Sequence, residues 1–126
     1  MSELKVDTLT GKTSAGDITV TDGSVTFKMQ DSLIKHWTIV DQTGTLQSLG
    51  SFNQTSLTDT AVGRTDVNFV NNFSSVNKCT TISNTYGMDG CWYQIGNTTN
   101  YRITNYISGA YTDFDHSSGK ITGDLA

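Results

Sequence analysis

Apolar and polar residues alternate along much of this chain, and the alternating stretches are separated by Asp, Asn, Ser and Gly residues. Alternation places successive side chains on opposite faces of an extended strand, so the pattern predicts an all-β fold. Asp-Gly pairs between such stretches favour tight hairpin turns. Two such pairs occur, Asp22-Gly23 and Asp89-Gly90, and each predicts a hairpin.

The first hairpin is predicted to turn at Asp22-Gly23, with Val20 opposite Val25 and one face of the ribbon apolar. A segment of about 30 residues buries too little surface to fold alone. We therefore expect residues 1–29 to be an assembly or attachment module that packs against copies of this chain or another subunit. The expected assembly residues are Leu4, Val6, Ile18, Val20, Val25 and Phe27.

Residues 30–36 are predicted to link this module to the main domain. The apolar spacing by four between Met29 and Trp37 favours a short helix over Ser32 to His36, with Asp31 as its N-cap. Met29 also continues the alternation of the preceding hairpin, which leaves the boundary open by several residues.

Residues 37–126 show turn signals about every 8 to 12 residues, which is typical of an antiparallel β-sandwich. The stretch from Phe52 to Arg64 is expected to be a loop. The expected strands include Thr45 to Phe52, Val67 to Phe69, a long hairpin over Thr80 to Ile95 that turns at Asp89-Gly90, a strand with Tyr101, Ile103 and Ile107 on one face, and Lys120 to Leu125 after a turn at His116 to Gly119.

Charge and hydropathy narrow the class of partner. The formal net charge is −4 and the pI is about 4.8, which disfavours nucleic acid and anionic membranes as partners. No apolar run approaches the ~20 residues of a membrane span, so we expect no membrane insertion. The opening Met1-Ser2-Glu3 does not resemble a signal peptide, so we expect synthesis in a cytosol and reduced Cys79 and Cys91.

Motifs for catalysis or cofactors are weak. Gly11-Lys12-Thr13 matches the end of a phosphate-binding loop, but Val6 replaces its first glycine. His36 and His116 are not spaced from Cys or acidic pairs as zinc ligands are. We expect no cofactor and no enzymatic activity, although hydrolysis by two carboxylates that meet in space stays open.

Asp113 and Asp115, next to His116, suit a hard cation such as calcium. A solvated turn is the plainer interpretation of the same three residues.

Aromatic residues near the C-terminus favour a contact surface. Strand parity places Tyr93 with the apolar residues, whereas Trp92 and Tyr106 point the other way. With Tyr111, these two residues are the candidates for an outward patch. Such a patch suits a bacterial surface glycan, and the alternative is packing against another sheet or subunit.

Short Thr- and Gly-rich motifs resemble tail-fibre-like virion structural proteins of tailed marine bacteriophages. The N-terminal matches are Leu4-Lys5-Val6-Asp7-Thr8-Leu9, Gly11-Lys12-Thr13 and Gly16-Asp17-Ile18-Thr19-Val20-Thr21. The matches to the head domain that ends many such fibres are Trp37, Gly44-Thr45, Ser51-Phe52-Asn53, Ser56-Leu57-Thr58-Asp59, Gly63 and Val67-Asn68-Phe69.

The resemblance covers most of the chain and thins out past Lys78. It implies a β-rich homotrimer, intertwined through its N-terminal strands, that is located in the virion after assembly in the host cytoplasm. A short fibre, a fibre tip and a capsid decoration protein all fit, because only about ten residues stand where a shaft would lie. Other virion proteins are then the expected partners. A lectin-like adhesin is the alternative function.

Overall fold

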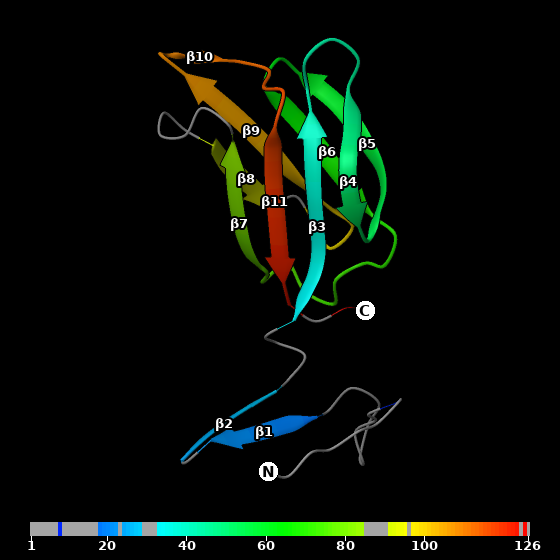
Figure 1. The fold of residues 1–126 in the computed structure, drawn as a ribbon, viewed down its shortest axis with the longest axis vertical. Helices are drawn as coiled ribbons and strands as arrows, with labels where there is room; N and C mark the ends of the chain where they lie inside the picture. The colour runs from blue at the N-terminus through cyan, green and yellow to red at the C-terminus, as the bar shows by residue number, and fades with distance from the viewer. Residues whose placement is uncertain are drawn as a thin grey trace, which may run out of the picture. The chain divides into compact units, whose positions relative to one another are not determined.

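The computed structural model describes residues 8, 18–22, 24–28, 33–84, 91–95, 97–123 and 125. Every regular element in these ranges is a β-strand, and every strand pair is antiparallel. The predicted all-β class is therefore confirmed. The chain divides into an N-terminal unit, Met1–Leu33, and a C-terminal unit, Ile34–Ala126; both are drawn in Figure 1.

The described strands of the N-terminal unit are β1 (Thr19–Asp22) and β2 (Val25–Lys28), which form a two-stranded sheet. Their register differs from the prediction, because Val20 lies opposite Phe27 and Asp22 lies opposite Val25. The turn is thus one residue later than Asp22-Gly23. Each residue of β1 therefore lies opposite a residue of β2 that is two positions further along the chain than predicted. Because side chains alternate between the two faces, a shift of two keeps Val20 and Val25 on one face.

The expected linker helix over Ser32 to His36 is wrong where the structure describes it. Residues from Ile34 onward belong to β3 (Ile34–Asp41), the first strand of the C-terminal unit. β-Branched residues are frequent in this segment, and they favour strands over helices. The predicted start of this domain at Trp37 is therefore three residues later than the start of the strand. Residues 29–32 lie outside the described ranges.

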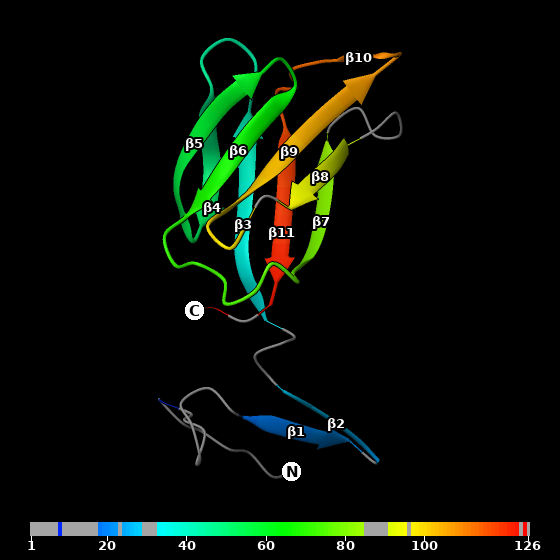
Figure 2. The ribbon, with the colours of Figure 1, turned by 180° about the vertical axis from the view of Figure 1, so that it is seen from behind.

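The C-terminal unit consists of two antiparallel sheets that pack face to face (Figures 1 and 2). The first sheet has the order β4 (Gln47–Phe52), β3, β11 (Ser117–Thr122), β7 (Cys79–Asn84). The second has β5 (Gln54–Ala61), β6 (Arg64–Phe69) and β9 (Asn100–Ile107) in this order, and β8 (Cys91–Ile95) and β10 (Ala110–Tyr111) also pair with β9. Figure 1 shows the first sheet in front, and Figure 2 shows the second.

Three expectations for the C-terminal strands are wrong. The expected loop before Arg64 contains the strand β5. The expected hairpin over Thr80 to Ile95 is split, because β7 pairs with β11 in one sheet and β8 pairs with β9 in the other. The Asp89-Gly90 turn itself lies outside the described residues. The last strand begins at Ser117, within the expected turn.

The apolar core lies between the two sheets. β6 alternates as predicted, with Val67 and Phe69 buried, and Tyr101 and Ile103 of β9 are buried beside them. Among the described residues the cluster contains Val40, Val67, Phe69, Phe73, Tyr101, Ile103 and Ile121, with Leu46, Leu57 and Ile82 packed against it. These residues come from both sheets, so the core holds the sheets together through burial of apolar surface.

Polar groups also join the sheets. His36 of β3 is fully buried, and its Nε2 lies 3.2 Å from the hydroxyl oxygen of Tyr101 in β9. Its Nδ1 lies 3.3 Å from the backbone oxygen of Asn53. Gly119 of β11 faces the Tyr101 ring, and a Cβ there would overlap the Tyr101 hydroxyl and lie 3.1 Å from Cζ. Glycine at position 119 therefore leaves the space that the buried tyrosine needs.

The corner between β4 and β5 depends on Asn53. This residue has φ +58°, a left-handed conformation that asparagine tolerates better than most residues. Its side-chain amide donates to the carbonyls of Lys35 and Asn71, both at 3.1 Å, and its Oδ1 accepts from the Asn71 amide at 2.7 Å. These bonds satisfy the backbone where the chain crosses from one sheet to the other.

A second buried polar cluster lies near the opposite end of β3. Asn105 of β9 donates to Gln42 Oε1 at 2.5 Å and to Ser117 Oγ at 2.6 Å. Gln42 in turn donates to Thr65 Oγ1 at 2.9 Å. All four side chains are buried, and each has a partner, as buried polar groups require.

Substitution of Gly119 by alanine is expected to lower the free energy of unfolding by about 2–3 kcal/mol, because the new methyl group displaces the Tyr101 hydroxyl. Tyr101→Phe alone is expected to cost about 1–2 kcal/mol through loss of the bond to His36. In the double variant the overlap with the hydroxyl is removed, so the double substitution should cost less than the sum of the two single costs by about 1 kcal/mol or more. Urea unfolding of the four proteins measures this coupling, and strictly additive costs would contradict the packing described.

The stability of the protein is expected to fall in mild acid. Burial lowers the pKa of His36 from 6.5 to about 4, and this effect outweighs the backbone hydrogen bonds that favour the charged ring. Between these values the unfolded chain binds a proton that the folded protein excludes. The stabilisation is therefore complete above about pH 6.5 and is lost as the pH falls toward 4.

From pH 7 to pH 5 this linkage should lower the free energy of unfolding by about 2 kcal/mol. Urea titrations at several pH values test it, together with NMR detection of the His36 ring in the native protein. A His36 ring that becomes protonated near pH 6.5 without loss of stability would contradict this account.

Candidate functional site

The outer face of the second sheet carries the charged residues Arg64, Asp66 and Arg102. In β6 the buried residues Thr65, Val67 and Phe69 alternate with Arg64, Asp66 and Asn68, which are only partly buried. The latter three residues therefore point away from the core.

The two arginines on this face have different partners. Arg102 of β9 donates to Asp66 through Nε at 2.6 Å and Nη2 at 2.9 Å, a bidentate pair that raises the pKa of Arg102. Arg64 instead lies on an aromatic ring, with its Cζ 3.8 Å from the centroid of Tyr111. Among the described residues, no carboxylate lies within ion-pair distance of Arg64.

Arg64, Tyr106 and Tyr111 form one cluster, which we call the aromatic–arginine cluster. Tyr106 and Tyr111 are paired across β9 and β10, and their rings meet edge to face with centroids 5.2 Å apart. Arg64 lies opposite Thr104 and Tyr111 lies opposite Tyr106 in the register of β9. Between them, the Gly63 carbonyl and the Thr112 amide both bond to the backbone of Asn105, so Arg64 and Tyr111 lie along the same edge of β9. Tyr111 is 41% exposed and Tyr106 is half-buried.

Gly63 fixes the start of the strand that carries Arg64. It has φ +68°, and a Cβ there would lie 2.6 Å from the Thr112 nitrogen and 2.7 Å from the Asn105 oxygen. Its amide donates to Asp113 Oδ1 at 2.5 Å, and its carbonyl accepts from the Asn105 amide at 2.8 Å. Only glycine fits this conformation and this space, so the turn before Arg64 is held in one position.

The structure brings together two of the three residues of the predicted aromatic patch. Tyr106 and Tyr111 touch each other as described above. Trp92 of β8 lies opposite Thr104 in the backbone register, and Arg64 lies opposite the same residue from β6. The Trp92 side chain is outside what the structure describes. Sequence reasoning did not select Arg64, although it is one of only two arginines and precedes an alternating strand.

The predicted assembly residues are described in part. Ile18 and Val20 are half-buried, and Val25 is 62% exposed. Phe27 belongs to β2, opposite Val20, and its side chain is outside the described part. Leu4 and Val6 also lie outside the described residues.

An apolar surface on the outer face of the first sheet was not predicted. Trp37 and Phe52 are opposite each other in the register of β3 and β4, and they are 37% and 53% exposed. The Trp37 ring lies over Gly50, where a Cβ would come within 3.2 Å of it. Ile39, two residues along β3 from Trp37, continues the same face.

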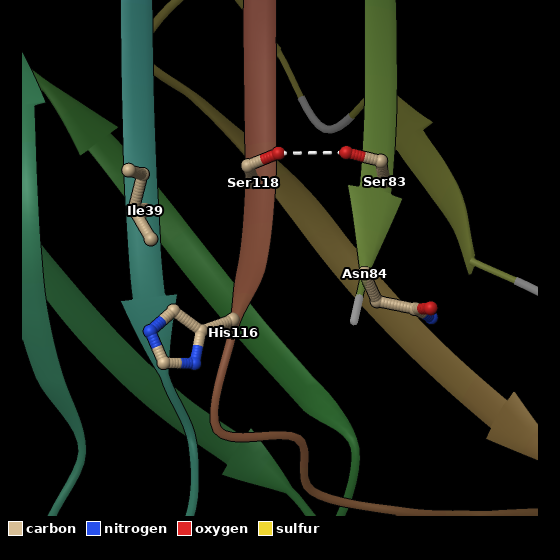
Figure 3. Close-up of a pocket in the computed structure, with 5 residues that line it drawn as sticks. All are labelled: Ile39, Ser83, Asn84, His116 and Ser118. Atoms are coloured by element: carbon tan, nitrogen blue, oxygen red, sulfur yellow. Dashed lines mark hydrogen bonds between the residues drawn. The ribbon is translucent and has the colours of Figure 1, made fainter. Parts of the chain in front are cut away.

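A shallow pocket of about 270 Å³ lies on the same sheet, lined by Ile39, Ser83, Asn84, His116 and Ser118 (Figure 3). Ser83 and Ser118 share a hydrogen bond of 2.8 Å across β7 and β11. The His116 ring lies beside Ile39 in this view, while Asn84 points to the other side. The lining offers hydroxyls and an imidazole, and Figure 3 shows His116 well apart from the Ser83–Ser118 pair.

The candidate cation ligands are dispersed. Asp113 accepts from the Gly63 amide, whereas Asp115 Oδ1 lies 3.6 Å from His116 Nδ1. Within the described ranges, no three His, Cys, Asp or Glu side chains gather as a metal site would require. His36, the other imidazole considered, is the buried core residue described above.

The Cys79 thiol is exposed and free, and the Cys91 side chain is outside the described part, so the expectation that both cysteines are reduced stays a prediction. In the portion of the chain that the structure covers, no helix is long and apolar enough to cross a membrane.

Comparison of the chain with protein-family models, with curated protein sequences and with solved structures found no match.

Proposed function

We propose that this protein is a non-enzymatic structural component of a bacteriophage virion, a short fibre, fibre tip or surface decoration protein, that acts by assembling with copies of itself. In this proposal residues 1–29 form the assembly module and the C-terminal unit is the exposed domain. The resemblance of the motifs within residues 4–21 and 37–69 to fibre-like virion proteins favours this function and a trimer. Other virion proteins are the further partners.

The observation that carries the proposal is the exposure of Val25 on a two-stranded sheet. A two-stranded hairpin alone is marginally stable in water. Its apolar face needs a cover, and Val25 is 62% exposed in the single chain. Association would bury Val25 and its neighbour Val20, which lie on the same face.

Exposed aromatic residues of the C-terminal unit support a second part of the proposal, in which this unit makes contacts of its own. Trp37 and Phe52 on the first sheet present an apolar surface that suits another protein subunit. Tyr106 and Tyr111 on the second sheet favour the alternative function, a lectin-like adhesin for a bacterial surface glycan.

Light scattering on the intact chain is expected to give three times the monomer mass of 13.7 kDa. Deletion of residues 1–28 is expected to give a monomer with unchanged β-sheet circular dichroism, because the core cluster lies wholly in the C-terminal unit. An intact chain that is a folded monomer would contradict the assembly proposal.

A matched pair of variants distinguishes burial of the apolar hairpin face from a general effect of added charge on association. Val25→Asp is expected to raise the dissociation constant about 100-fold or more, because it buries a charge in the interface. Thr19→Asp adds the same charge on the other face of the hairpin and should leave the mass unchanged. Equal effects of the two substitutions would contradict the assignment of the apolar face.

A further inference from the structure

The aromatic–arginine cluster contains a cation whose charge no acidic group of the described chain neutralises. Asp66 lies two residues from Arg64 on the same strand face, but both of its oxygens accept from Arg102. Asp113 is held by the Gly63 amide. The Arg64 guanidinium therefore keeps its hydrogen-bond donors available to a ligand while it lies on the Tyr111 ring.

The cluster is also fixed in place before any ligand arrives. Tyr111 is held against Tyr106 by strand pairing and by ring contact. Arg64 directly follows Gly63, whose backbone is held by hydrogen bonds to Asp113 and Asn105. Fixing a binding group in its bound position reduces the entropy that binding costs, so this arrangement favours recognition.

The position of the guanidinium decides which class of ligand fits. A neutral sugar binds tyrosine by stacking on the ring face, but one face of Tyr111 already carries Arg64. A carboxylate matches the planar fork of arginine in the same bidentate way that Asp66 matches Arg102. Long nucleic acids are disfavoured by the net charge of −4.

We propose that the aromatic–arginine cluster binds the carboxylate of an acidic saccharide, a hexuronic acid unit, through Arg64, with the tyrosine rings beside the sugar. This inference rests on the proposed alternative function, contact with a surface glycan, and names its ligand class. Arg64 recognises the carboxylate, and Tyr111 positions Arg64.

Calorimetric titration of the full chain with trigalacturonic acid tests the proposal, with its methyl ester as the matched neutral ligand. We expect the free acid to bind at least about tenfold more tightly than the ester, because only the acid offers a charge-assisted bond to Arg64. Affinity for the acid should fall as salt is raised, as it does for an exposed ion pair.

Three variants locate the site. Arg64→Gln and Tyr111→Leu are each expected to weaken binding of the acid about tenfold or more, since one removes the guanidinium and the other its support. Lys120→Gln is the control, because it removes an exposed positive charge from the outer face of the other sheet. It should change the affinity less than about twofold, and all variants should retain cooperative thermal unfolding.

Several results would overturn the proposal, and each can be distinguished from failure of the broader proposed function. Equal binding of acid and ester that is lost in Tyr111→Leu would reject the acidic ligand but keep a glycan contact. Binding of sulfated saccharides alone would reject the carboxylate. Equal competition by a triglutamate peptide would assign the cluster to a protein partner. Absence of all binding by an assembled oligomer would reject the inference and leave the assembly proposal intact.

Discussion

The C-terminal unit depends on a buried hydrogen bond between its two sheets. Tyr101 spans the core to reach His36 on the facing sheet, and Gly119 leaves room for the ring. Loss of this bond would leave the buried His36 Nε2 without the Tyr101 hydroxyl, and an unpaired polar group in this position would carry a desolvation penalty of about 1–3 kcal/mol. The bond fixes the relative position of β3, β9 and β11 more specifically than apolar packing alone does.

The second polar cluster connects the core to the surface. Asn105 bonds Gln42 and Ser117 through its side chain, and its backbone amide donates to the Gly63 carbonyl. The turn that precedes Arg64 is thus attached to the interior of the sandwich. A surface group that is anchored in this way loses little freedom on binding, which is why the aromatic–arginine cluster is a better candidate for recognition than an isolated exposed side chain.

Local patterns predicted those strands whose buried face is apolar. β6 and β9 fit this description, because Val67, Phe69, Tyr101 and Ile103 alternate with polar residues. In β3 the alternation of Trp37 with Ile39 marks the outer face instead, and the buried face includes His36 and Thr38. Sequence periodicity cannot reveal that buried polar groups will find partners on distant strands.

Other errors have equally physical causes. β5 was missed because it is an edge strand with mostly exposed polar residues, which no burial pattern distinguishes from a loop. Asp89-Gly90 is a local turn signal, and it does not determine whether the strands on its two sides pair with each other or with other strands. The contact of Arg64 with Tyr111 arises because β6 and β10 both pair with β9 at neighbouring positions, so it became visible only in the fold.

The two units therefore differ in the interactions that stabilise them. The C-terminal unit has its own apolar core and buried hydrogen bonds between its sheets, whereas the sheet of β1 and β2 has an apolar face with an exposed Val25. Hydrogen exchange of the intact chain at high and low protein concentration tests this difference most directly. We expect amides in β3 and β11 to be protected at both concentrations, and amides in β1 and β2 to be protected only where the chain is oligomeric. Strong protection of β1 and β2 in a monomer would contradict this expectation.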